Sequence, residues 1–149
     1  MQTPITQTPA PPMARLPDWP ERLAAVVAAA RPQAFLLGTH DCLRFSCACV
    51  QAVAGVDLWP QFAGYTTPAE SLRTIARIAP SLAQAVSAVL GSQPVPPLLA
   101  RRGDVLLYVD AGIEHLGVCL GALGAVPGPA GLAHLPLDHT GFTQAWRVG

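Results

Sequence analysis

The sequence contains few charged residues. Asp, Glu, Lys and Arg make up 12% of its 149 residues, about half the share that is usual in globular proteins. Acidic and basic residues balance, so the formal net charge is zero, and we expect no nucleic-acid partner and no attraction to an anionic membrane. A surface with so few charges is often covered by another protein. A genomic bias toward Ala and Pro codons accounts for the same composition.

Targeting and membrane signals are also missing. Residues 1–16 have no basic start followed by an apolar run, so no signal peptide is predicted. The uncharged segment 78–100 is too interrupted, by Pro80 among others, to insert into a bilayer. We therefore expect a protein made and kept soluble in a cytoplasm, with its four cysteines reduced and no disulfide framework.

The chain divides into an arm and one domain. Residues 1–17 are rich in Pro, Thr and Gln and have no apolar periodicity, which is typical of a flexible arm or an extended docking tail. Residues 18–149 have the length of a single domain, and the apolar share of 51% is enough for a core.

Helices precede strands in the predicted order. Capping and breaker signals indicate helices at 18–30, about 42–54, 67–78 and 81–91. Alternating apolar residues and turn signals indicate strands at 105–109 and 113–120, with weaker ones near 123–126, 132–137 and 145–148. This order predicts an α+β fold, with N-terminal helices packed on a C-terminal antiparallel sheet.

The second predicted helix is apolar almost all round. Only Arg44 and Gln51 form a polar stripe along it. A helix of this kind is expected to be buried in the domain. Cys42 would begin this helix, where unpaired N–H groups favour a thiolate nucleophile. His115 lies in an apolar strand and could face the helix as a base. The alternative is that both residues only fill space, as we expect for the other three cysteines.

A metal or iron–sulfur site is a further alternative. Cys42, Cys47, Cys49 and His115 are the residues that could build it, but their spacing matches no standard ligand pattern. We therefore predict no metal and no cofactor.

Three motifs in order resemble the NlpC-like cell-wall cysteine peptidase superfamily. Residues 38–42 (Gly-Thr-His-Asp-Cys) resemble its Asp-Cys motif, residues 102–106 (Arg-Gly-Asp-Val-Leu) its Gly-Asp step into the first core strand, and residues 114–121 its His-x-Gly-x-x-x-Gly strand. The ending at 145–148 (Ala-Trp-Arg-Val) is similar to small phage-encoded members found with tail genes. The resemblance covers roughly 19–149.

The resemblance implies a papain-like fold in which Cys42 is the nucleophile and His115 the base. It implies cleavage of amide bonds in peptidoglycan stem peptides, by a virion tail protein bound to tail-tip or baseplate proteins. His40 and Asp41 could line the cleft, although Asp41 also suits a helix cap.

Two departures from the family pattern concern activity. Leu43 and Arg44 stand where the family has Ser-Gly. The stretch 125–128, where the family has the residue that orients the imidazole, offers no suitable side chain, so His134, Asp138 or a backbone carbonyl would have to substitute. The sequence therefore leaves two main functions open: a tail-tip peptidase or amidase, and a tail component that kept the fold and lost the chemistry. A third, weaker alternative is another acyl transfer by the same Cys42 and His115, since a fold does not fix the substrate.

Overall fold

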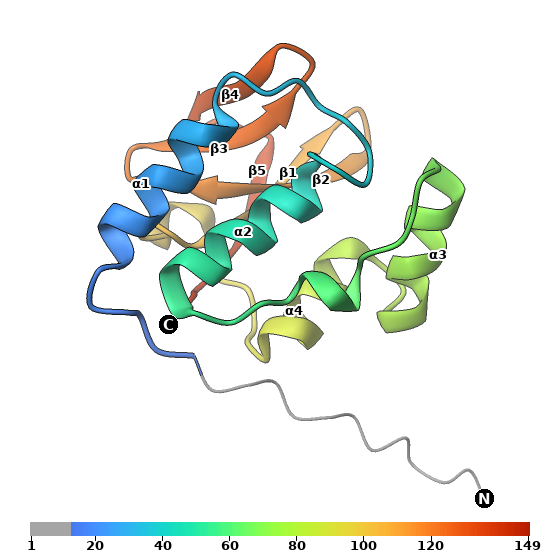
Figure 1. Cartoon of the computed structure of the whole chain (residues 1–149), viewed down its shortest axis with the longest axis horizontal. Coiled ribbons are helices and arrows are strands. Elements are labelled where there is room, and N and C mark those ends of the chain that lie inside the picture. The colour runs from blue at the N-terminus through green and yellow to red at the C-terminus, as the bar shows by residue number, and fades with distance from the viewer. Residues whose placement is uncertain (1–12) are drawn as a thin grey trace, which may run out of the picture.

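The computed structural model describes residues 13–149, in which helices come first and strands follow (Figure 1). The helices are α1 (Trp19–Ala30), α2 (Cys42–Ala54), α3 (Pro68–Ile78) and α4 (Leu82–Leu90), with short 3-10 turns η1 (Trp59–Gln61) and η2 (Pro97–Leu99). The strands are β1 (Val105–Asp110), β2 (Ile113–Cys119), β3 (Leu123–Gly128), β4 (Gly131–Pro136) and β5 (Phe142–Trp146). The predicted α+β class, with a cysteine-bearing helix packed on a C-terminal antiparallel sheet, is confirmed, and this layout is the one expected for a papain-like fold.

The five strands form one antiparallel sheet in the order β4-β3-β2-β1-β5. A tight hairpin joins β1 to β2, and Ala111 and Gly112 in its turn both have positive φ angles, of 50° and 77°, as a primed turn requires. β2 pairs with β3 only near its end, at Val118 and Cys119. The beginning of β2 therefore separates from β3, and the N-terminal end of α2 lies beside it (Figure 1).

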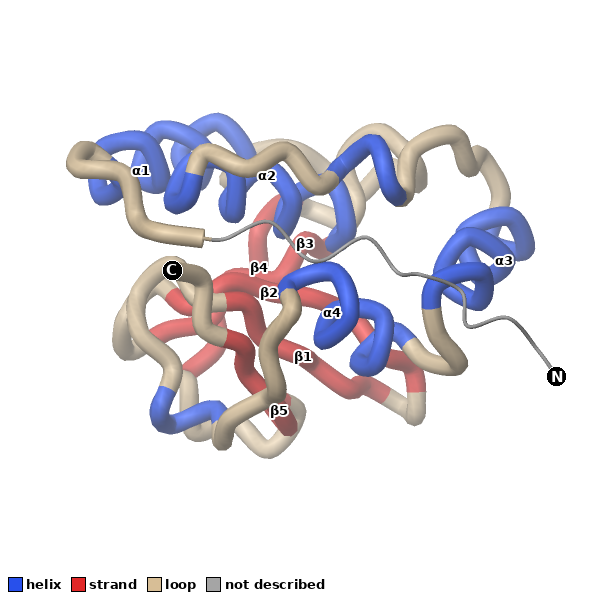
Figure 2. Tube along the Cα trace, turned by 90° about the horizontal axis from the view of Figure 1, so that it is seen from below, coloured by secondary structure: helices blue, strands red, loops and turns tan. Residues whose placement is uncertain are grey.

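The two faces of the sheet are packed differently. Leu116 and Val118 of β2 belong to the large core under the helices, together with Phe45 of α2. Cys119 belongs to a smaller apolar cluster on the opposite face, with Leu106, Val126, Phe142 and Ala145. Figure 2 shows α1 and α2 as a layer along one side of the sheet. Because successive residues of a strand point to opposite faces, this division fixes the face on which each strand residue lies.

Helix ends follow local sequence signals, with one exception. Asp41 caps α2, and Gly55 ends it with a φ of 72°; Thr67 caps α3 as predicted. Asp18, which stands at the predicted start of the first helix, makes no capping hydrogen bond. Its carboxylate instead forms an ion pair with Arg22 one turn later, at 2.9 Å.

The domain begins earlier than predicted. The Leu16 N–H donates to the Val53 carbonyl at 2.8 Å. The Arg15 guanidinium donates to the carboxylate of Asp104 at 3.0 Å and to the Val148 carbonyl at 3.0 Å. Residues 13–17 are thus part of the domain, and the rest of the predicted arm lies outside the described residues.

Within residues 13–149, none of the helices combines the length and the apolar character needed to cross a bilayer.

Candidate active site

Cys42 is the first residue of α2 and is partly exposed. The backbone of Leu116, in the middle of β2, acts to lower the pKa of the Cys42 thiol. The main chain of Leu43 and of Cys42 itself acts in the same direction, as expected for the unpaired N–H groups at a helix N-terminus. These backbone groups are arranged to favour a thiolate.

Burial outweighs that effect. The packing around the Cys42 sulfur raises its pKa to about 11, and the negative charge of Asp41 adds to the rise, while the three backbone groups oppose it. A thiol with this pKa is almost entirely protonated at neutral pH. The lowered pKa expected from the helix terminus is therefore not found in this state of the site.

Asp41 holds the entrance to α2 in place. Its carboxylate accepts hydrogen bonds from the backbone N–H groups of Gly38 and Arg44, both at 2.8 Å, and from the hydroxyl of Tyr65. Burial, followed by this hydrogen bond, raises the pKa of Tyr65. Since Asp41 is only 2% exposed, its role is structural and it does not line an open cleft. No local sequence signal connects Tyr65 to Asp41.

His115 lies on the face of the sheet opposite to Cys42. It pairs with Tyr108 of β1, and the two rings are 6.4 Å apart between centroids. Tyr108 packs with Phe142 in the smaller cluster, whereas Leu116, the next residue of β2, faces the helices. The expected pairing of the Cys42 sulfur with the His115 ring is thus not formed. The alternation of Leu116 and Val118 was the sequence signal for this orientation.

The other two predicted histidines lie on the helix side. His40 is 8% exposed, and its ring meets that of Phe45 edge-on, 6.5 Å between centroids. His134 pairs across β3 with Ala125, a member of the large core, so it shares that face. Among the described residues, neither Nε2 atom has a hydrogen-bond partner. His134 cannot orient His115, because the sheet lies between them.

No other predicted residue takes the orienting role. The stretch that should supply it ends in Pro127 and Gly128, which have no hydrogen-bonding side chain. Asp138 is exposed in the turn after β4. In the described part of the chain, Cys42 and His115 therefore lack both their mutual contact and a third residue.

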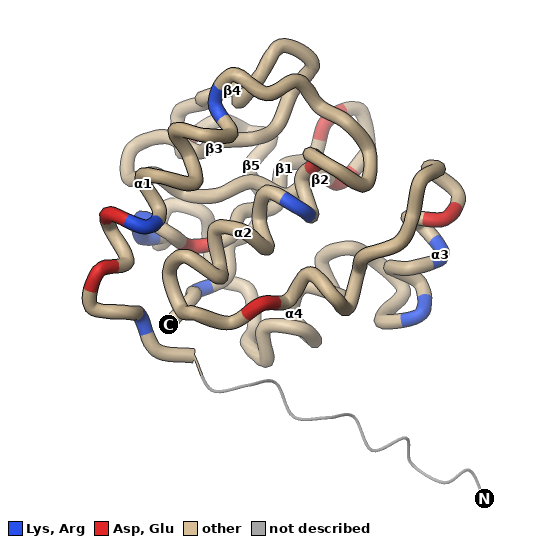
Figure 3. The backbone as a smooth tube through the Cα atoms, in the orientation of Figure 1, with Lys and Arg blue, Asp and Glu red and all other residues tan. Residues whose placement is uncertain are grey.

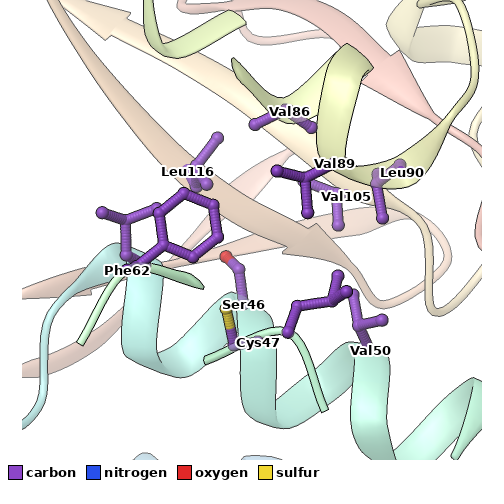
Figure 4. A pocket seen from close by; sticks show the side chains of 11 residues that line it. Ser46, Cys47, Val50, Phe62, Val86, Val89, Leu90, Val105 and Leu116 are labelled. Carbon is purple, nitrogen blue, oxygen red and sulfur yellow. The ribbon is translucent and has the colours of Figure 1, made fainter. Parts of the chain in front are cut away.

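An apolar pocket lies behind α2, between that helix, α4 and the sheet (Figure 4). The Ser46 hydroxyl points into it without a hydrogen-bond partner among the described residues. Cys47 also lines it, and burial raises the pKa of this thiol to about 12. Because these side chains are core residues and Cys42 is not part of the lining, we interpret the pocket as a packing void of the core.

The chain belongs to the family described as "Domain of unknown function (DUF6950)", which matches residues 14–148. Among solved structures, it is similar to that of the resuscitation promoting factor interacting protein RipA mutated at one histidine. The two chains are 16% identical, with a TM-score of 0.42, and the match covers 99% of this chain and 75% of the other. No curated protein matches the sequence.

Proposed function

We propose that this domain keeps a papain-like, NlpC-like fold but serves as a structural component of a phage tail tip and not as a hydrolase. The observation that supports this most strongly is the position of Cys42 and His115 on opposite faces of the sheet. A cysteine hydrolase needs its base within hydrogen-bond reach of the sulfur. It also needs the thiolate, which burial disfavours here.

The surface supports an assembly role. Exposed apolar side chains are present on several elements of the described chain, while charges are few: Leu72 is 66% exposed, Leu98 68% and Ile113 61%. Surfaces of this kind promote association, and neighbouring subunits would cover them in a tail.

The test compares a point substitution with a deletion in phage particles that carry this protein. With Cys42→Ala, we expect normal assembly and normal infection, because the thiol has no chemical role. Deletion of the whole chain should prevent tail assembly. Particles with Cys42→Ala that assemble normally but infect walled cells poorly would contradict the proposal.

A peptidoglycan peptidase or amidase is the second candidate, and the surroundings of the Cys42 sulfur favour it. The main chain of Leu116, Leu43 and Cys42 that stabilises negative charge there could also stabilise an oxyanion. This function requires that one of the two histidines on the helix side, His40 or His134, comes within hydrogen-bond reach of the Cys42 sulfur, or that β2 rotates and brings His115 to that face. Incubation with purified peptidoglycan tests it: new amine ends released by the wild type and not by Cys42→Ala would support hydrolysis.

A further inference from the structure

A polar pocket of about 160 Å³ lies along α3, which stands to one side of the sheet (Figures 1 and 2). Its other wall is the segment that leads from η1 into α3. A Cβ built on Gly64 in this wall would have no atom within 4 Å. There is thus open space beside Gly64. The lining residues are Ala63, Gly64, Tyr65, Glu70, Arg73, Thr74 and Arg77.

Two cations in this pocket lack an acidic partner. Arg73 and Arg77 are one helical turn apart, so they lie on the same side of α3, and both are exposed. Neither forms an ion pair within residues 13–149, and residues 1–12 contain no Asp or Glu. Within residues 13–149, the one side-chain hydrogen bond of the Arg77 guanidinium goes to the Thr74 hydroxyl, at 3.5 Å. Figure 3 shows two basic segments and one acidic segment close together on and next to α3.

The charge of the pocket favours a ligand with one negative charge. Glu70 also lines it, and its carboxylate accepts the Thr66 N–H at 3.3 Å. Two guanidiniums and one carboxylate give a local charge of about +1 at neutral pH. This balance suits a carboxylate, which an arginine can hold with two parallel hydrogen bonds, better than a phosphate dianion, which Glu70 would repel.

We propose that the pocket of Arg73 and Arg77 binds a carboxylate presented by a peptide segment of a partner protein. Only the identity of that partner, a neighbouring subunit, rests on the proposed function. The carboxylate is either an Asp or Glu side chain or the C-terminus of the segment. The ligand joins α3 to the neighbouring chain at a place where the domain has little other charge.

Amide chemical shifts of the isotope-labelled full chain test the proposal. The probe is the blocked peptide Ac-Ala-Glu-Ala-NH2, titrated against its Gln counterpart, which has no charge. We expect saturable shifts of the Gly64 and Thr74 amides with the Glu peptide and none with the Gln peptide. A third peptide, Ac-Ala-Gln-Ala-OH, carries the carboxylate only at its C-terminus and shows which of the two sources the pocket prefers.

Variants locate the binding. The double substitution Arg73→Gln, Arg77→Gln should weaken binding at least about tenfold, as expected when charge-assisted hydrogen bonds are lost. Arg147→Gln is the matched control, because Arg147 is exposed after β5 and away from the pocket. Equal binding of the Glu and Gln peptides, no binding to the wild type, or unchanged affinity in the double variant would overturn the proposal. Since the titration needs no phage particle, its result is independent of the Cys42→Ala test.

Discussion

Replacement of Asp41 by Ala tests how the site is held together. The carboxylate is buried and accepts from two backbone N–H groups and the Tyr65 hydroxyl. Alanine removes the acceptor and leaves the donors of Gly38, Arg44 and Tyr65 without a partner. Water cannot easily replace the carboxylate there, because the residue is 2% exposed.

The expected loss follows from these contacts. A helix cap contributes about 1 kcal/mol, and each further buried donor left unpaired costs about 1–3 kcal/mol. With two such donors, we expect Asp41→Ala to lower the free energy of unfolding by about 3–7 kcal/mol. Thr67→Ala is the matched control: Thr67 caps α3 through one hydrogen bond, from Glu70 at 3.2 Å, and is exposed. Thr67→Ala should lower the free energy of unfolding by about 1 kcal/mol.

Urea unfolding followed by circular dichroism measures both variants. The slope of the unfolding free energy against urea concentration should be the same in all proteins. The shift in the urea concentration at the unfolding midpoint then gives the loss of stability directly. Tyr65→Phe removes one hydrogen bond to the carboxylate and should cost about 2 kcal/mol. Equal losses for Asp41→Ala and Thr67→Ala would refute the reasoning, because the buried donors would then contribute nothing beyond an ordinary cap.

Three further predictions concern the fold. Arg15→Ala should lower the free energy of unfolding by about 3 kcal/mol in urea, since it removes the closer ion-pair partner of the fully buried carboxylate of Asp104, at 3.0 Å, and leaves only Arg101, at 4.0 Å; a loss under about 1 kcal/mol would contradict this. The free energy of unfolding should fall above about pH 8.5, the ordinary pKa of a thiol. Burial raises the pKa values of the Cys47 and Cys49 thiols in the folded state. Above about pH 8.5 the unfolded chain therefore binds fewer protons than the folded chain, which favours unfolding. Cys49→Ala should make that fall shallower in unfolding measured from about pH 7 to about pH 10, and an unchanged pH profile would count against it. Gly38→Ala should reduce the melting temperature, because a Cβ there would meet the Tyr65 carbonyl and the φ angle is 79°; an unchanged melting temperature would show that the loop adapts.

Local signals made much of the fold predictable. Thr67, followed by a proline and Glu70, marks the start of α3, and the glycine after α2 ends that helix in the left-handed conformation. Strand ends were less predictable, because they depend on pairing. β5 begins at Phe142 where a strand was expected near 145–148, since β5 joins β1 through a register irregularity beside Leu107.

The candidate site was predictable in position but not in geometry. The sequence places Cys42 at the start of a buried helix and His115 in the adjacent strand, and both are found there. Which face His115 occupies is decided by the register of β2 against the core, where Leu116 and Val118 must be buried. The pKa of Cys42 depends on burial by segments distant in sequence, so the helix-terminus argument alone gave the wrong direction.

The pKa of the Cys42 thiol tests the central claim, that the cysteine and histidine do not form a catalytic pair. It is obtained from the rate of iodoacetamide alkylation at Cys42 against pH, read by peptide mass spectrometry in the wild type and in His115→Ala. We expect a pKa of about 11 that is the same in both proteins. A pKa well below the ordinary value of about 8.5 that rises when His115 is removed would contradict the claim and show an assembled dyad.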